Sequence, residues 1–218
     1  MSKRTIIKGA AILTAANLIT RIMGFFNRIY MSNAIGTTGM ALYQLVMPIY
    51  ILSWSITSSG FSTAISRITA KENAKRHYGN ISKTVTVAIC LCMMISLAVS
   101  LVMYFGSDFI AANLIKDSRT AVSLKILAFA VPFMASGSCI RGYFIGMQQQ
   151  AIPALSQVLE QTIRIIVIAV LAPLLSQKGL EYACAAAITG VLLGEAFACL
   201  FVVVSYKGLS KKARYICR

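Results

Sequence analysis

Charged side chains are scarce in this 218-residue sequence, and acidic ones are scarcer still. Only 12% of the residues are charged, with six Asp or Glu against 21 Lys or Arg. Because about a quarter of the residues in a soluble globular domain are charged, this composition excludes that class. The hydrophobic share is 58%, and long apolar runs recur along the whole length. The sequence therefore predicts an all-α polytopic membrane protein.

Side chains that catalyse reactions or bind metals are also few. The single histidine, His77, lies in a basic loop where we expect it to be solvated, and Cys90 and Cys92 have neither the spacing nor the nearby histidine of a zinc site. The sequence contains no nucleophile with a paired base and no glycine-rich phosphate loop. We therefore expect no enzyme, cofactor or metal site. We interpret the six cysteines as mostly small buried hydrophobes: Cys90, Cys92, Cys139, Cys184, Cys199 and Cys217.

The apolar runs and their connections predict six spans, with approximate bounds 9–34, 40–65, 84–105, 122–147, 154–175 and 182–205. A tight turn at 36–39 follows the first span, and Pro48 should kink the second. We interpret the small residues at 58–64 as helix-packing residues. The connection at 106–119 could hold a short interfacial helix. Residues 1–206 would form one six-helix transmembrane lobe and residues 207–218 a basic cytoplasmic tail.

The net charge of +15 could indicate nucleic-acid binding, but the basic residues lie mostly between the apolar segments. Basic connections of this kind face anionic lipid on the cytoplasmic side. The N-terminal leader, the 67–83 connection and the tail carry thirteen Lys or Arg, against three in the connections on the opposite side. We therefore expect membrane lipids and not nucleic acid as partners, with both termini in the cytoplasm.

Two arginines lie inside the first apolar span. Arg21 and Arg28 are seven residues apart, so both project from one face of a helix. A charge well inside a spanning helix costs about 2.5 kcal/mol or more, and such a residue normally faces the bundle interior or a watery cavity. The pair therefore indicates a cationic stripe for an anion, although snorkelling to the lipid headgroups is an alternative, above all for Arg28.

Three further charges occur in the last two spans. Glu160 and Arg164 are four residues apart, in the orientation that favours an ion pair on one helix face. They could neutralise each other or contact a substrate. Glu195 could be a proton or cation site, or a protonated, hydrogen-bonded packing residue.

Five local motifs occur in a characteristic order: TRIMGFFNR at 20–28, GxxGxxxYQ at 36–44, SGxxTAISR at 59–67, RGYFxGxQ at 141–148 and SQxxEQxxR at 156–164. Together they resemble the stage V sporulation protein B branch of the polysaccharide transporter family. Its superfamily also includes lipid II flippases and multidrug and toxin extrusion transporters. Two features differ from the lipid II flippases: Arg28 follows Arg21 by seven residues and not six, and the second span begins without an arginine.

The resemblance implies two six-helix lobes around a cavity and a role in polysaccharide, cell-wall or spore assembly at the bacterial cytoplasmic membrane. Alternating access would carry a lipid-linked sugar pyrophosphate across, and arginine can bind such a head bidentately. The candidate substrate-binding residues are then Arg21, Arg28, Arg141, Glu160 and Arg164, and Glu195 is the candidate for ion coupling. We expect this chain to be the first lobe only, requiring a second lobe or a partner chain. The alternatives are a cation-coupled multidrug exporter of the same fold and a non-transporting membrane scaffold.

Overall fold

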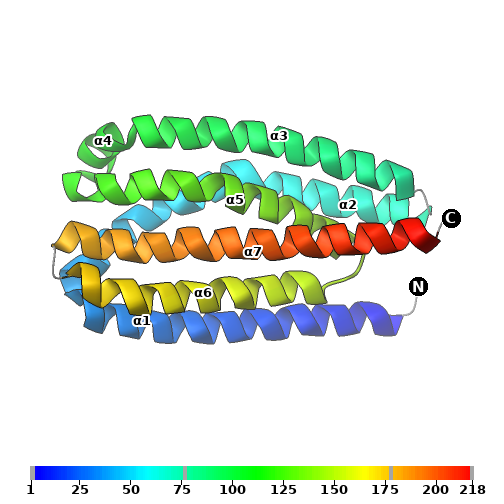
Figure 1. Ribbon diagram of the computed structural model, residues 1–218, viewed down its shortest axis with the longest axis horizontal. Helices are drawn as coiled ribbons and strands as arrows, with labels where there is room; N and C mark the ends of the chain where they lie inside the picture. The colour runs from blue at the N-terminus through cyan, green and yellow to red at the C-terminus, as the bar shows by residue number, and fades with distance from the viewer. Residues whose placement is uncertain (1–2, 76–77, 177–178, 217–218) are drawn as a thin grey trace.

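The computed structural model describes residues 3–75, 78–176 and 179–216, which form a bundle of long helices (Figure 1). The helices are α1 (Lys3–Trp54), α2 (Gly60–Ala74), α3 (Tyr78–Phe105), α4 (Ser107–Phe109), α5 (Ala121–Gly146), α6 (Ala151–Ser176) and α7 (Leu180–Ile216). A π-helical turn at Ser55–Ser59 joins α1 to α2. A second π-helical turn, at Ile110–Ile115, and a 3-10 turn, at Ser118–Thr120, connect α4 to α5. The short helical connection expected at 106–119 is therefore present.

Helix α1 consists of two limbs that meet at Gly36. The backbone there has φ 76° and ψ 173°, a conformation that glycine adopts far more readily than other residues. This is the tight turn predicted at 36–39. The backbone remains helical through Pro48, and the next irregularity is the π-helical turn at Ser55–Ser59, a feature that commonly bends helices.

The described residues contain five segments long and apolar enough to cross a membrane: Gly9–Ala74, Ile81–Phe105, Ser118–Gly146, Ala151–Leu175 and Leu180–Gly208. The first of these includes both limbs of α1, so the crossing segments number six, as predicted. Many large apolar side chains remain exposed, including Phe25, Leu101 and Val170. Exposed apolar faces on helices with satisfied backbones are suited to contact with lipid. The protein is an all-α, multi-pass membrane protein.

Several helices extend beyond the predicted spans. Helix α2 continues to Ala74 and α3 begins at Tyr78, so most of the 67–83 connection is helical; α7 continues past 205 to Ile216. Lys, Arg, Ala and Glu are good helix formers, so a helix can leave the apolar layer without ending. The hydropathy pattern therefore predicts where a helix leaves the apolar layer of the membrane, but it does not predict where the helix ends.

The described cysteines differ in burial. Cys92, Cys139, Cys184 and Cys199 are buried as expected, whereas Cys90 is exposed. Two residues along a helix turn the side chain by about 200°, so Cys90 and Cys92 point in opposite directions. His77 and Cys217 lie outside the described residues.

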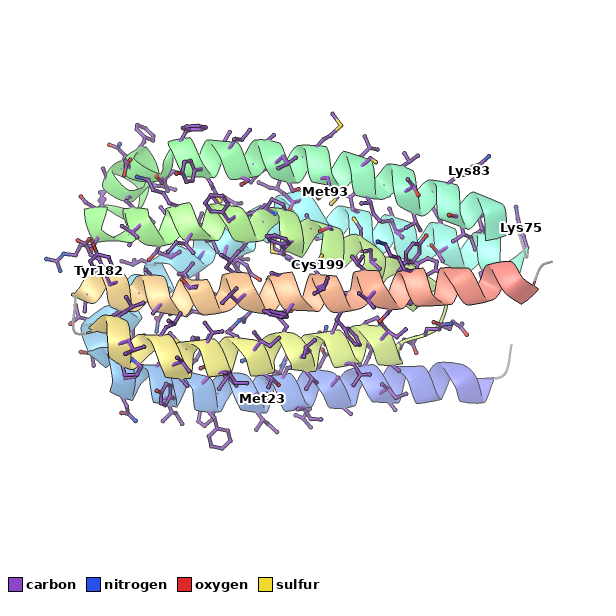
Figure 2. The ribbon with its side chains drawn as sticks, in the orientation of Figure 1. Met23, Lys75, Lys83, Met93, Tyr182 and Cys199 are labelled. Carbon is purple, nitrogen blue, oxygen red and sulfur yellow. The ribbon has the colours of Figure 1, made fainter. Side chains whose placement is uncertain are left out.

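The connections separate to the two ends of the bundle in the way that the loop charges predict. One end of the bundle holds the start of α1, the connection from α2 to α3, and the end of α7 (Figure 1). Lys75 and Lys83 lie at this end (Figure 2). The Gly36 turn, α4 and the start of α7 near Tyr182 lie at the other end (Figures 1 and 2).

Helices α5 and α7 form the centre of the bundle: α7 packs against α5 and α6, and α5 also packs against α2 and α3. Glycines allow the closest approaches. A Cβ atom at Gly142 would lie 2.6 Å from the backbone oxygen of Ser62, and one at Gly146 would lie 2.6 Å from that of Ser66. Ser62 therefore lies at a close helix contact, in agreement with the packing role interpreted for residues 58–64.

We predict that Gly142→Ala lowers the stability of the protein by about 1–3 kcal/mol, because the added methyl group overpacks the contact between α5 and α2. The matched control is Gly60→Ala, since a Cβ at Gly60 meets nothing within 4 Å. Thermal unfolding in detergent compares the two variants. Equal melting temperatures for both would contradict the tight contact.

Candidate functional site

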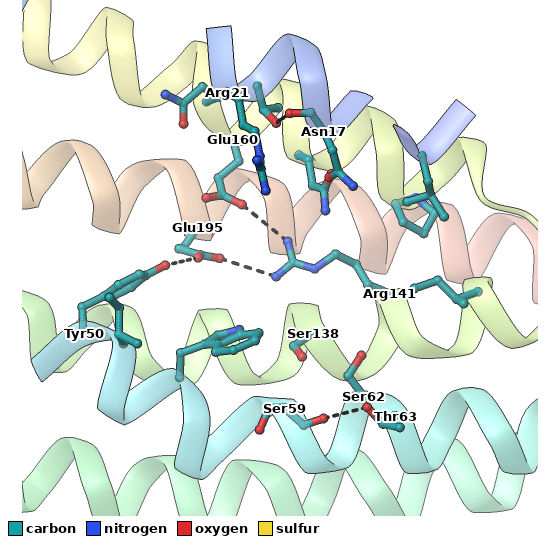
Figure 3. Close-up of a pocket in the computed structure, with 18 residues that line it drawn as sticks. Asn17, Arg21, Tyr50, Ser59, Ser62, Thr63, Ser138, Arg141, Glu160 and Glu195 are labelled. Carbon is teal, nitrogen blue, oxygen red and sulfur yellow. Dashed lines mark hydrogen bonds and ion pairs between the residues drawn. The ribbon is translucent and has the colours of Figure 1, made fainter. Parts of the chain in front are cut away.

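A cavity of about 630 Å³ opens between both limbs of α1, the Ser55–Ser59 turn, α2, α5, α6 and α7 (Figure 3). Its charged lining residues are Arg21, Arg141, Glu160 and Glu195. Hydroxyl and amide side chains supply much of the remaining wall. The size is within the range of small-molecule sites in proteins. We call this space the Arg141 cavity.

Arg141 of α5 lies between two carboxylates from different helices (Figure 3). Its Nη1 is 3.5 Å from Oε2 of Glu160 on α6, and its Nη2 is 3.8 Å from Oε2 of Glu195 on α7. Tyr50, on the second limb of α1, donates a hydrogen bond of 2.7 Å to Oε1 of Glu195. The side chain of Glu195 is only 5% exposed. Four segments of the chain are thus joined through polar contacts.

Glu160 bridges two arginines. Besides Arg141, it accepts a hydrogen bond of 2.6 Å from Nη2 of Arg164, the residue four positions later. The pair expected from the i, i+4 spacing is therefore formed. With both glutamates ionised, Glu160 and Glu195 compensate the charges of Arg141 and Arg164, which reduces the cost of burying them.

The close approach of α6 and α7 depends on two glycines of α7. A Cβ atom at Gly194 would lie 2.9 Å from the backbone oxygen of Glu160, and one at Gly190 would lie 2.7 Å from a side-chain atom of Ile168. Glycine at these positions lets the two backbones approach as small residues do in other membrane helices. Glu195, the next residue after Gly194, is thereby brought to the same region as Glu160.

A second cavity, of about 350 Å³, lies beside the first and is lined by Arg21, Arg28 and Arg164. We call it the three-arginine cavity; no Asp or Glu of the described residues lines it. Asn27 also lines it, is 7% exposed, and has an Oδ1 without a hydrogen-bond partner. The buried Nε of Arg164 is likewise unpartnered. This is an arrangement of excess positive charge and unused polar atoms.

The two arginines of the first span differ from the buried ones. Arg21 and Arg28 are exposed and, within residues 3–75, 78–176 and 179–216, form no ion pair. Both line the three-arginine cavity, as their shared helical face predicts, and Arg21 lines the Arg141 cavity as well. All six residues singled out in the sequence therefore line one or both cavities.

Sequence reasoning missed Tyr50, Trp54 and Gln161. Gln161 belongs to a helical series with Gln157, Glu160 and Arg164, whose i, i+3, i+4 and i+7 spacing marks one face. That periodicity could have identified it. Tyr50 and Trp54 are one helical turn apart in an apolar run, and no local signal distinguishes them from lipid-facing aromatics.

The fold and the two adjoining cavities define the class of the protein. It is an all-α, polytopic membrane protein with an internal polar site that contains arginines. The chain belongs to the polysaccharide biosynthesis protein family, whose sequence model matches residues 6–217. This confirms the resemblance read from the five motifs.

Curated relatives occur in Bacillus subtilis (strain 168). This chain is 33% identical to stage V sporulation protein B over 95% of its own length and 40% of the relative's. It is 30% identical to the uncharacterized membrane protein YabM, over 89% of this chain and 36% of the relative. It is 27% identical to the lipid II flippase MurJ, over 74% and 31% respectively. The chain thus spans 40% or less of these relatives. No solved structure matches it significantly.

We predict that Glu160→Gln destabilises the protein by about 3–5 kcal/mol, because it leaves the guanidinium groups of Arg141 and Arg164, which are only 14% and 15% exposed, without a full countercharge. The control is Asp108→Asn. Asp108 pairs with Lys125 at 3.1 Å, but the two side chains are 72% and 40% exposed, so we expect a cost of about 0–1 kcal/mol. Denaturant or thermal unfolding measures both. Similar losses for the two variants would contradict the importance of the buried network.

Proposed function

We propose that this chain forms one lobe of a flippase that moves a lipid-linked oligosaccharide or cell-wall precursor across the bacterial cytoplasmic membrane. The observation that carries the proposal is the three-arginine cavity, where Arg21, Arg28 and Arg164 converge with no carboxylate among the described lining residues. Such a site favours a dense anion. The relative named as a lipid II flippase supports a substrate of this kind.

The chemistry fits a diphosphate between a sugar and a polyprenyl chain. Guanidinium groups bind phosphate oxygens bidentately, and these contacts strengthen where water is partly excluded. The lipid chain of the substrate would remain in the bilayer beside the exposed apolar faces. Arg21 and Arg28, which have no carboxylate partner among the described residues, would bind the diphosphate, and Arg164 would approach it from α6.

Transport by alternating access requires a second wall around the cavities. We propose that residues 1–206 form one lobe and that a second lobe or a partner chain supplies the opposite wall. The two lobes would rock about the bound head group, as in transporters built from repeats.

A cation-coupled multidrug exporter of the same fold is the competing function. Such an exporter needs a membrane-embedded acid that binds and releases a cation. Glu160 and Glu195 each lie within 4 Å of Arg141, an arrangement that supports a countercharge role for both. Dependence of transport on arginine or on carboxylate distinguishes the two functions.

We predict that Arg21→Ala in the full-length protein abolishes flipping of a lipid-linked sugar diphosphate while membrane insertion remains normal. Arg28→Ala should also reduce it strongly, because both guanidinium groups line the same cavity. Transport into sealed vesicles is the measurement, and the exposed Arg119→Ala is the matched control. Normal flipping by Arg21→Ala would rule out the anion cavity.

The competing functions predict other results. Loss of drug export in Glu195→Gln, with normal export by the arginine variants, would favour the exporter. No transport by the wild type would favour a scaffold.

We further propose that the bundle end holding Lys75 and both ends of the chain faces the cytoplasm, in agreement with the positive-inside rule. The test introduces single cysteines at Lys75 and Lys116 in a background in which all six native cysteines are replaced by alanine. A membrane-impermeant maleimide should label Lys116→Cys in intact cells and Lys75→Cys only after lysis. The reverse pattern would invert the topology.

A further inference from the structure

The Arg141 cavity has a lining unlike that of the three-arginine cavity. Its polar wall is dominated by uncharged donors and acceptors, among them Asn17, Thr20, Ser62, Ser138, Gln157 and Gln161. The buried Oε1 of Gln157 has no hydrogen-bond partner among the residues that the structure describes. The carboxylates in this wall are already held by arginines and by Tyr50. Apart from the guanidinium group of Arg21, the cavity therefore offers mainly hydroxyl and amide groups to a ligand.

Two aromatic side chains line this cavity: Tyr50, whose hydroxyl group is bonded to Glu195, and Trp54. Trp54 ends α1 immediately before the Ser55–Ser59 turn, lines the cavity and is 44% exposed. A sugar ring presents hydroxyl groups around its edge and a patch of C–H groups on its face. An indole face beside many hydrogen-bonding groups complements both parts of such a ring.

The two cavities are contiguous through shared residues, because Arg21 and Gln161 line both. An anionic group among the arginines would thus lie next to a group in the Arg141 cavity. A sugar attached directly to a diphosphate has this geometry of an anion followed by a neutral polyol.

We propose that the Arg141 cavity is the sugar subsite of the transporter and that Trp54 is its stacking platform. This proposal rests on the proposed function and adds the residue that recognises the sugar. Hydroxyl and amide groups of the wall bind the ring's hydroxyls. In the network around Arg141, the arginines compensate the charges of Glu160 and Glu195, which disfavours a cationic ligand in this cavity.

The test measures binding of two lipids to the full-length protein in nanodiscs by native mass spectrometry. One probe is undecaprenyl diphosphate, and the other is the same lipid carrying one N-acetylglucosamine. We expect Trp54→Ala to weaken binding of the sugar-bearing lipid about fivefold and to change binding of the sugar-free lipid less than about twofold. Trp54→Phe should retain most of the difference, since it keeps an aromatic face. Phe105→Ala, at a 78% exposed aromatic on α3, is the control.

The outcomes separate this proposal from the proposed function. If Arg21→Ala abolishes binding of both lipids and Trp54→Ala weakens only the sugar-bearing one, both ideas are supported. If the wild type binds the two lipids equally, or if Trp54→Ala weakens them by the same factor, the sugar subsite is overturned while the anion site stands. If the wild type binds neither lipid, both are overturned.

Discussion

The charged side chains at the centre of the bundle are paired with countercharges from neighbouring helices, and this pairing constrains how the central helices meet. Arg141, Glu160 and Glu195 come from α5, α6 and α7, and each lies within 4 Å of an oppositely charged group. In a medium of low dielectric constant, a misaligned helix would leave one of these groups unpaired at high cost. The ion pairs therefore define the relative register of three helices, and Tyr50 extends the network to α1.

Glycines make this arrangement sterically accessible. At Gly142 the backbone of α2 approaches α5, and at Gly194 the backbone of α6 approaches α7, so closely that a Cβ atom would lie under 3 Å from a carbonyl oxygen. Short helix separations allow the side chains of Glu160 and Glu195 to reach Arg141. Small residues and paired charges thus act together to hold the helices in contact. In lipid, the burial of apolar surface alone does not drive helices together.

The distribution of unpaired charge carries the functional argument. Arg141 and Arg164 are balanced by glutamates, whereas Arg21 and Arg28 on the first limb of α1 have no such partner in the part of the chain that the structure describes. Helix α1 as a whole packs mainly against α6, and on its first limb Tyr30 donates a hydrogen bond of 3.2 Å to the backbone oxygen of Ala169 on α6. Two exposed arginines at the margin of the central network are a favourable place for an anion that arrives from outside the bundle.

The sequence by itself determined the all-α membrane class, the six crossing segments, the turn at Gly36 and the Glu160–Arg164 pair, since hydropathy, glycine and i, i+4 spacing are local signals. It also identified Arg21 and Arg28 as sharing a face. Helix ends were predicted less well, because α2 and α7 continue as polar helices beyond the apolar layer. Only the tertiary structure showed that Glu195 lies beside Arg141 and that Tyr50 and Trp54 line the Arg141 cavity. It also showed that the charged residues line two adjoining cavities. Those contacts join residues up to 145 positions apart, and helix packing, which no local pattern encodes, decides them.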